Sequence, residues 1–150
     1  MIKRIVFDGN DGTGKTTRLE EMKKMFPNIK FEDRGIFSKT TLDDMLFDGL
    51  DYEREKRIDT EHIEAIKYAR RKRDGFRKEI ERCDETLFVI CRCEPGVCQE
   101  RIRLRGDSIE EEYHTMSDLI KYGKRFDVLA DIVRDLPNVM VVDTENDIIR

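Results

Sequence analysis

A glycine-rich stretch near the amino terminus decides the fold, and it reads Phe7-Asp8-Gly9-Asn10-Asp11-Gly12-Thr13-Gly14-Lys15-Thr16-Thr17. Residues 9–16 fit the pattern G-x-x-x-x-G-K-[ST], in which backbone N–H groups surround phosphate oxygens when a strand precedes the loop and a helix follows it. Ile2–Phe7 is rich in residues that favour strands, and the residues from Lys15 to Met25 follow a helical pattern. The sequence therefore predicts a strand, a phosphate-binding loop and a helix in succession.

The residues of this loop have separate expected roles. The glycines let the backbone turn with its N–H groups inward, and the amino end of the helix adds a positive field where the β-phosphate sits. Lys15 is expected to reach the β- and γ-phosphates, and the Thr16 hydroxyl to ligate Mg²⁺. Thr17 is expected to support the α-phosphate end. The predicted triphosphate-binding residues are Gly9, Asn10, Asp11, Gly12, Thr13, Gly14, Lys15, Thr16 and Thr17.

Strands and helices are predicted to alternate along the rest of the chain. Ile29–Glu32, Leu87–Cys93 and Val139–Val142 read as further strands, and Val97–Arg105 reads as a short helix. A helix of about six turns is predicted from one apolar stripe, formed by Ile58, Ile63, Ile66, Phe76 and Ile80. Another helix, ending near Leu136, is predicted from the spacing of Leu119, Ile120, Phe126, Leu129, Ile132 and Val133.

This alternation predicts the fold class and the place of a ligand. Right-handed strand–helix–strand crossovers put parallel strands in one sheet that helices cover on both faces. We therefore expect an α/β fold, a P-loop NTPase-type three-layer sandwich with a short parallel sheet flanked by helices. Ligands of such sheets bind outside the carboxyl ends of the strands. The chain of 150 residues is expected to form one domain over residues 1–150.

Composition and charge narrow the expected partners. The formal net charge of -4 argues against an extended nucleic-acid partner. Met1–Phe7 is too short and too charged for a signal peptide, and no apolar run approaches the ~20 residues of a membrane span, so we expect a cytoplasmic protein with no membrane partner. The cysteines lack a C-x-x-C pair, which favours plain buried thiols over a zinc site; they are Cys83, Cys91, Cys93 and Cys98.

Charged residues follow the second predicted strand, where Asp33 and Arg34 stand side by side. Asp33 is a candidate for holding Mg²⁺ through water or for taking a proton, and Arg34 for holding an acceptor phosphate. A surface ion pair is the alternative. The position after a strand favours a role in the site.

An arginine-rich segment, Glu100-Arg101-Ile102-Arg103-Leu104-Arg105-Gly106, follows the third predicted strand. Arg101 and Arg105 lie one helical turn apart, so both can face a triphosphate when the turn at Gly106 closes over it, whereas Arg103 points elsewhere. Phosphoryl transfer spreads negative charge over oxygens and needs cations and a lid that excludes water. A solvated basic face is the alternative for this cluster.

Taken together, these segments resemble the P-loop nucleotide kinases of the thymidylate kinase and deoxynucleoside kinase superfamily. Residues 7–17 resemble the family loop, in which an acidic residue precedes the first glycine, and Asp11-Gly12 favours the thymidylate kinase side. Residues 33–38 are similar to the family's D/E-R-S segment. Residues 100–106, with the glutamates at 110–112, are similar to its arginine-rich lid, expected here around residues 101–113. The resemblance is at superfamily level.

The resemblance implies a Mg-ATP-dependent kinase of a deoxynucleoside monophosphate, with ATP and Mg²⁺ as cofactors and a homodimer as one possible assembly. It implies catalytic roles for Lys15, Asp33, Arg34, Arg101 and Arg105, metal binding by Thr16 and Asp33, and substrate binding by Asp8, Asp11, Arg34, Phe37 and Arg70. The loop at residues 143–146 is implied to border the adenine; a metal-binding role for Asp143 is the lower-ranked alternative. Phe37, Phe47 and Tyr68 are candidates to stack on a base, with core packing as the alternative.

The acceptor stays open at this point. Relatives have an additional strand and a substrate-binding helix before the Asp-Arg segment, where this chain has room for one helix. A deoxynucleoside kinase needs a carboxylate to accept a proton from a sugar hydroxyl, whereas a phosphate acceptor needs extra arginine. A polynucleotide 5'-kinase is disfavoured by the net charge. A non-catalytic nucleotide-binding regulator would keep residues 9–16 without transferring phosphate.

Overall fold

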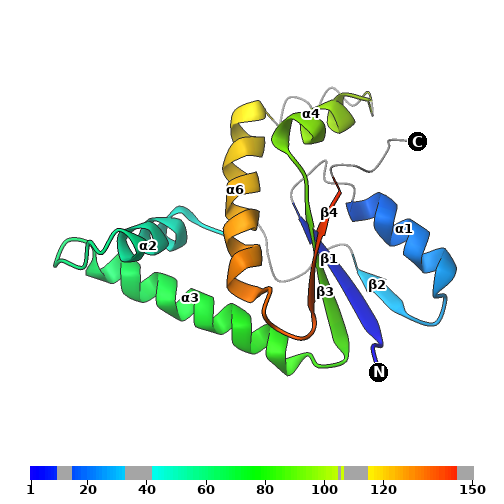
Figure 1. Ribbon diagram of the computed structural model, residues 1–150, viewed down its shortest axis with the longest axis horizontal. Helices are drawn as coiled ribbons and strands as arrows, with labels where there is room; N and C mark the ends of the chain where they lie inside the picture. The colour runs from blue at the N-terminus through cyan, green and yellow to red at the C-terminus, as the bar shows by residue number, and fades with distance from the viewer. Residues whose placement is uncertain (10–14, 33–41, 105, 107–114, 145–150) are drawn as a thin grey trace.

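The computed structural model describes residues 1–9, 15–32, 42–104, 106 and 115–144, and at Lys15 and Thr16 it describes the backbone only. Strands and helices alternate along these residues (Figure 1), in agreement with the predicted α/β fold. In chain order they are β1 (Arg4–Gly9), α1 (Lys15–Met25), β2 (Lys30–Glu32), α2 (Asp44–Arg54), α3 (Ile63–Arg82), β3 (Thr86–Arg92), α4 (Pro95–Leu104), α6 (Met116–Val133) and β4 (Val139–Asp143).

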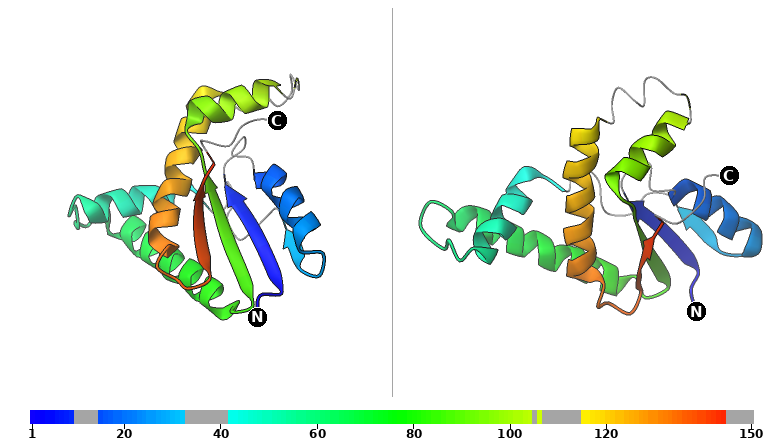
Figure 2. Two further views of the ribbon diagram at one scale, coloured as in Figure 1. Left: turned by 45° about the vertical axis from the view of Figure 1, so that its right-hand side comes forward. Right: turned by 45° about the horizontal axis from the view of Figure 1, so that its top comes forward.

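The strands form a four-stranded parallel sheet in the order β2-β1-β3-β4, which places the strand before the glycine-rich loop in its interior. Alternation along β1 sends Ile5 and Phe7 to one face, where they pack with Leu19 of α1. Val6 faces the opposite side and packs with residues of α2, α3 and α6. Figure 2 shows α1 on one side of the sheet and α3 and α6 on the other. The predicted three-layer sandwich is confirmed.

The direction of the connections reverses between the neighbouring strands β1 and β3. From β1 the chain continues to α1 on one face, and from β3 it continues to α4 and α6, which pack together on the other side. Neighbouring parallel strands whose connections leave in opposite directions leave room for a ligand at their carboxyl ends. Gly9 and Cys91, paired in register, mark this position.

A helical hairpin formed by α2 and α3 extends away from the sheet (Figure 1). Its first helix was not predicted, because Gly49 interrupts its helical propensity. A Cβ at Gly49 would lie 2.1 Å from the carbonyl oxygen of Ala65, so the close approach of the helices requires glycine. The predicted inclusion of Ile58 in the long helix is wrong: this residue lies in the connection, 56% exposed, and α3 begins at Ile63.

The structure also bears on the expectations for membrane spans and for the cysteines. Among the helices that the structure describes, none has both the length and the apolar character required to cross a bilayer. All four cysteines are free thiols; Cys91 and Cys98 are buried, and Cys83 and Cys93 are half-buried. The expected burial of the thiols thus holds for two of them, Cys91 and Cys98.

Candidate nucleotide-binding site

The end of β1 has the geometry that the glycine-rich pattern requires. Asp8 is 3% exposed, and Gly9 has a φ of 152°, a conformation that residues with a Cβ rarely adopt. After residues 10–14, which lie outside the described part of the chain, α1 begins at Lys15. The amino end of α1, which carries the positive end of the helix dipole, lies near the carboxyl end of β1 (Figure 1). This arrangement suits a bound polyphosphate.

Arg101 of α4 is buried against the residue that follows β4. Its Nη2 donates to the carbonyl oxygen of Thr144 at 2.6 Å, and its Nη1 donates to Thr144 Oγ1 at 3.3 Å. Thr144 is itself fully buried, and its backbone N–H donates to the carbonyl oxygen of Arg92 at 2.8 Å. The structure thus joins the arginine-rich helix to the loop implied to border a nucleotide base, a link that the sequence did not reveal.

The remaining lid residues are only partly placed. Arg103 is exposed and pairs with Glu100 one turn away, on a different side of α4 from the buried Arg101. Arg105 and residues 107–113 lie outside the described residues. The simultaneous approach of Arg101 and Arg105 to a triphosphate therefore stays a prediction.

The segment with Asp33, Arg34 and Phe37 also lies outside what the structure describes, but both of its ends are placed. β2 ends at Glu32, which is paired in register with Val6 of β1. On the other side, Leu42 is fully buried in the core beside α2. The segment therefore connects the end of an edge strand to the first turn of α2.

Arg70, a predicted substrate residue, lies on α3 and contacts α2. Its Nε donates to Glu53 Oε2 at 2.5 Å, and Arg73 Nη1 donates to Glu53 Oε1 at 2.9 Å. The hydrogen bond from Arg70 and then that from Arg73 hold the pKa of Glu53 below its usual value. Phe47 and Tyr68, the aromatic candidates that the structure describes, are partly buried and pack against the core.

A cavity of about 340 Å³ opens between α6 and the carboxyl ends of β3 and β4. Its polar lining includes Arg92, Lys124, Asp127 and Asp143, the last residue of β4. Arg92 Nε donates to Asp127 Oδ1 at 2.7 Å, which raises the pKa of Arg92 above its ordinary value. Sequence reasoning considered only Asp143 here; the position of Arg92 at the end of an apolar strand was the available signal for a second residue.

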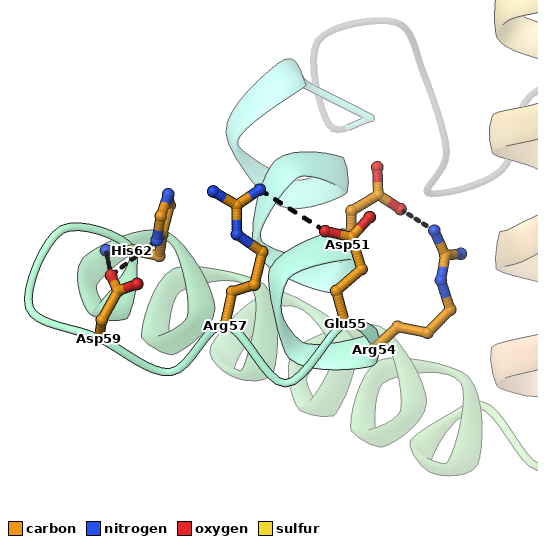
Figure 3. Close-up of polar contacts among 6 residues, drawn as sticks. All are labelled: Asp51, Arg54, Glu55, Arg57, Asp59 and His62. Atoms are coloured by element: carbon orange, nitrogen blue, oxygen red, sulfur yellow. Dashed lines mark hydrogen bonds and ion pairs between the residues drawn. The ribbon is translucent and has the colours of Figure 1, made fainter.

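A second polar cluster lies at the outer end of the α2–α3 hairpin (Figure 3). Within the described part of the chain, Asp59, Glu61 and His62 are the group whose ligand atoms lie close enough to share a metal ion. Asp59 Oδ1 lies 2.6 Å from His62 Nδ1 and accepts the backbone N–H groups of Glu61 and His62 at 3.1 Å. These bonds close the turn before α3. Of the predicted metal ligands, Thr16 belongs to the first turn of α1, where only its backbone is described, and Asp33 lies outside the described residues.

Comparison with known proteins identifies the fold. No protein-family model matches the sequence, and no curated protein matches it. Among solved structures, a deoxyadenosine kinase from M. mycoides with bound dCTP superimposes on the chain with a TM-score of 0.57 and 17% sequence identity. The alignment covers 97% of this chain and 92% of that chain. The chain has the α/β fold of P-loop kinases, with a four-stranded parallel sheet flanked by helices.

Proposed function

We propose that the chain is a Mg-ATP-dependent phosphotransferase whose acceptor is a deoxynucleoside monophosphate, acting as a single domain over residues 1–150. One observation carries the proposal. The G-x-x-x-x-G-K-T sequence runs from the end of an interior parallel strand to the second residue of α1, in a chain with the P-loop kinase fold.

The loop residues Gly9–Thr17 would hold the triphosphate. The backbone at Gly9 and the amino end of α1 suit an anion, because N–H groups that lack partners within the helix point toward it. Lys15 would neutralise the β- and γ-phosphates, and Thr16 with Asp33 would hold Mg²⁺, which supplies charge neutralisation at the transferred group. An acceptor oxygen attacks the γ-phosphorus in line, and the bond to the β–γ bridging oxygen breaks. No covalent enzyme intermediate is required.

The donor base would lie beside Arg101 and the loop at residues 143–146. The support is the pair of hydrogen bonds from Arg101 to Thr144, which fixes the position of this loop relative to α4. Arg105 would complete the lid and place a positive charge on the developing negative charge of the transferred group. Water exclusion by the lid would favour transfer over hydrolysis.

The acceptor would lie on the side of the segment 33–41, with Asp8 and Asp11 bordering it and Phe37 against the base. Arg34 is the preferred ligand of the acceptor phosphate. Arg70 is a second candidate, but binding there has to compete with Glu53, whose carboxylate accepts hydrogen bonds from both Arg70 and Arg73.

A deoxynucleoside kinase is the second candidate function, and one observation favours it. The similar solved structure is a deoxyadenosine kinase. In that case Asp33 would act as the general base that takes the proton of the sugar hydroxyl, and Arg34 would orient Asp33 rather than bind a phosphate.

The two reactions are separated by a transfer assay with γ-labelled ATP and Mg²⁺. Each deoxynucleoside monophosphate, each deoxynucleoside and a 5'-hydroxyl oligonucleotide are offered in turn, with Lys15→Met as the inactive control. Label on a monophosphate that disappears in Lys15→Met supports the proposal, and label on nucleosides alone favours the second candidate. Mg-ATP binding without any transfer, unaffected by Arg101→Ala and Arg105→Ala, would instead identify a regulator.

A further inference from the structure

We propose that Asp59, Glu61 and His62 bind a zinc ion at the outer end of the α2–α3 hairpin. Their side chains offer two carboxylates and one imidazole, and one ligand atom from each lies within 4.8 Å of the others. The hairpin extends away from the sheet (Figure 1), so this site is remote from the amino end of α1, where the triphosphate is proposed to bind. The inference goes beyond the proposed function and does not depend on it.

His62 is the fixed member of the group. The residue is 7% exposed, and its ring lies against that of Tyr52, with 4.0 Å between the ring centroids. Its carbonyl oxygen accepts the backbone N–H of Ile66 in α3 at 3.1 Å. Its Nδ1 lies 2.6 Å from Asp59 Oδ1 (Figure 3), and among the described residues this carboxylate is the one hydrogen-bond partner of the ring. A buried imidazole is therefore held with one nitrogen aimed at an exposed carboxylate.

No cation balances the negative charge of this group. Four other carboxylates within residues 51–64 have an arginine or lysine nitrogen at 3.9 Å or less; they are Asp51, Glu53, Glu55 and Glu64. In the part of the chain that the structure describes, Asp59 and Glu61 have no such partner. Arg57 pairs with Glu55 at 3.7 Å, and Figure 3 shows its guanidinium extending away from Asp59. Two adjacent carboxylates without a basic partner attract a divalent cation.

One imidazole and two carboxylates favour zinc over the hard cations. Mg²⁺ and Ca²⁺ take oxygen ligands, whereas Zn²⁺ accepts imidazole nitrogen and carboxylate oxygen together. Atoms that share a tetrahedral zinc ion lie about 3.4 Å apart, so the 2.6 Å contact between His62 and Asp59 has to open by about 1 Å. The Asp59 side chain is 55% exposed and Glu61 is exposed, so both can move around the fixed histidine. The fourth zinc position is left for water.

Asp59 also has a structural role, which a test has to separate from metal binding. Its Oδ1 accepts the backbone N–H groups of Glu61 and His62 at 3.1 Å. Asparagine keeps an oxygen at this position, so Asp59→Asn preserves these two hydrogen bonds and removes the charge. Glu61→Gln removes the other carboxylate from an exposed side chain. Glu64→Gln is the matched control, because Glu64 is an exposed carboxylate of the same region that already pairs with Lys67.

The test is a titration of the full chain with zinc chloride, followed by the amide and histidine ring signals in NMR spectra. We expect zinc to shift the amide signals of residues 59–64 and the ring signals of His62. Asp59→Asn and Glu61→Gln should each weaken this binding about tenfold or more. Glu64→Gln should bind zinc within about twofold of the wild type. Magnesium chloride at the same concentration should leave these signals in place.

Three results would overturn the inference. Asp59→Asn could bind zinc as tightly as the wild type, zinc could shift the signals of the cysteine residues alone, or magnesium could shift residues 59–64 as strongly as zinc. The last result would identify a diffuse acidic surface without a coordination site. The titration contains no nucleotide, so a chain that binds zinc here but transfers no phosphate would contradict the proposed function and support this site.

Discussion

The guanidinium of Arg101 and the carbonyl oxygen of Thr144 lie 2.6 Å apart, although 43 residues separate them in the chain. This contact joins α4, which leads into the predicted lid, to the end of β4. The buried Arg101 thus connects the helix before the predicted lid to the residue after β4, and the proposed function puts both beside a bound nucleotide.

Replacing Arg101 with methionine should therefore affect both stability and nucleotide binding. Loss of the hydrogen bonds to Thr144 should lower the free energy of unfolding by about 2 kcal/mol, and the KM of ATP should rise about tenfold. Denaturant unfolding and steady-state kinetics measure these effects. Arg103→Met is the control, because Arg103 is exposed and pairs with Glu100 on the same helix. Equal effects of the two substitutions would contradict a special role for Arg101.

Gly49 and Gly75 offer a matched test of the packing between α2 and α3. At Gly49 a Cβ would lie 2.1 Å from the carbonyl oxygen of Ala65, whereas at Gly75, also helical, nothing lies within 4 Å of an added Cβ. We expect Gly49→Ala to destabilise the protein by about 2 kcal/mol or more and Gly75→Ala to stabilise it by about 0.5–1 kcal/mol. Thermal and denaturant unfolding measure both. A stabilising Gly49→Ala substitution would show that the helices do not approach this closely.

The pair of arginines on Glu53 predicts a dependence of stability on pH. Hydrogen bonds from Arg70 and Arg73 hold the pKa of Glu53 below its usual 4.5. A lowered carboxyl pKa contributes stability that is fully present above the pKa of the unfolded chain and is lost as the pH falls through the folded pKa. The wild-type protein should thus be more stable than Glu53→Gln near neutral pH, and the difference should shrink below pH 4.5. A difference that grows on acidification would contradict this assignment.

We expect Asn138 to stabilise the fold without contributing to nucleotide binding. Its Nδ2 donates to the carbonyl oxygens of Ile80, Cys83 and Thr86 at 2.8, 3.1 and 3.2 Å, where the chain turns into β4. Asn138→Ala leaves buried carbonyls without this donor and should cost about 2 kcal/mol of unfolding free energy. Nucleotide affinity should not change. Asn28→Ala, in an exposed turn, is the control and should stay within about 0.5 kcal/mol of the wild type.

The elements around the glycine-rich loop could be predicted from the sequence, because their signals are local. The helix predicted from Lys15 to Met25 has these bounds in the structure, and the apolar strands after it follow the predicted order. Helix α2 was missed because Gly49 lowers its helical propensity, and the reason for this glycine, its close approach to Ala65, lies in the next helix. The reason for a glycine within a helix can be recognised only when the residue that packs against it is known.

The candidate site also has a part that the sequence predicts and a part that it does not. The pattern at residues 9–16 predicts phosphate binding because all of its parts lie in one short segment. Arg125 and Leu42, in contrast, are 83 residues apart, and no local pattern marks their contact. Contacts of this kind depend on how the helices pack. The sequence therefore predicts the phosphate-binding loop, but not the contacts between the helices around it.

Binding of Mg-ATP to the wild-type chain, compared with Lys15→Met and Lys24→Met by titration calorimetry, tests the central claim most directly. Both lysines belong to α1, but Lys24 lies in its last turn and is exposed. We predict that the wild type and Lys24→Met bind Mg-ATP equally, and that Lys15→Met binds it about 10- to 100-fold more weakly. Equal binding by all three proteins, or no binding by the wild type, would contradict the assignment of residues 9–17 as the triphosphate site.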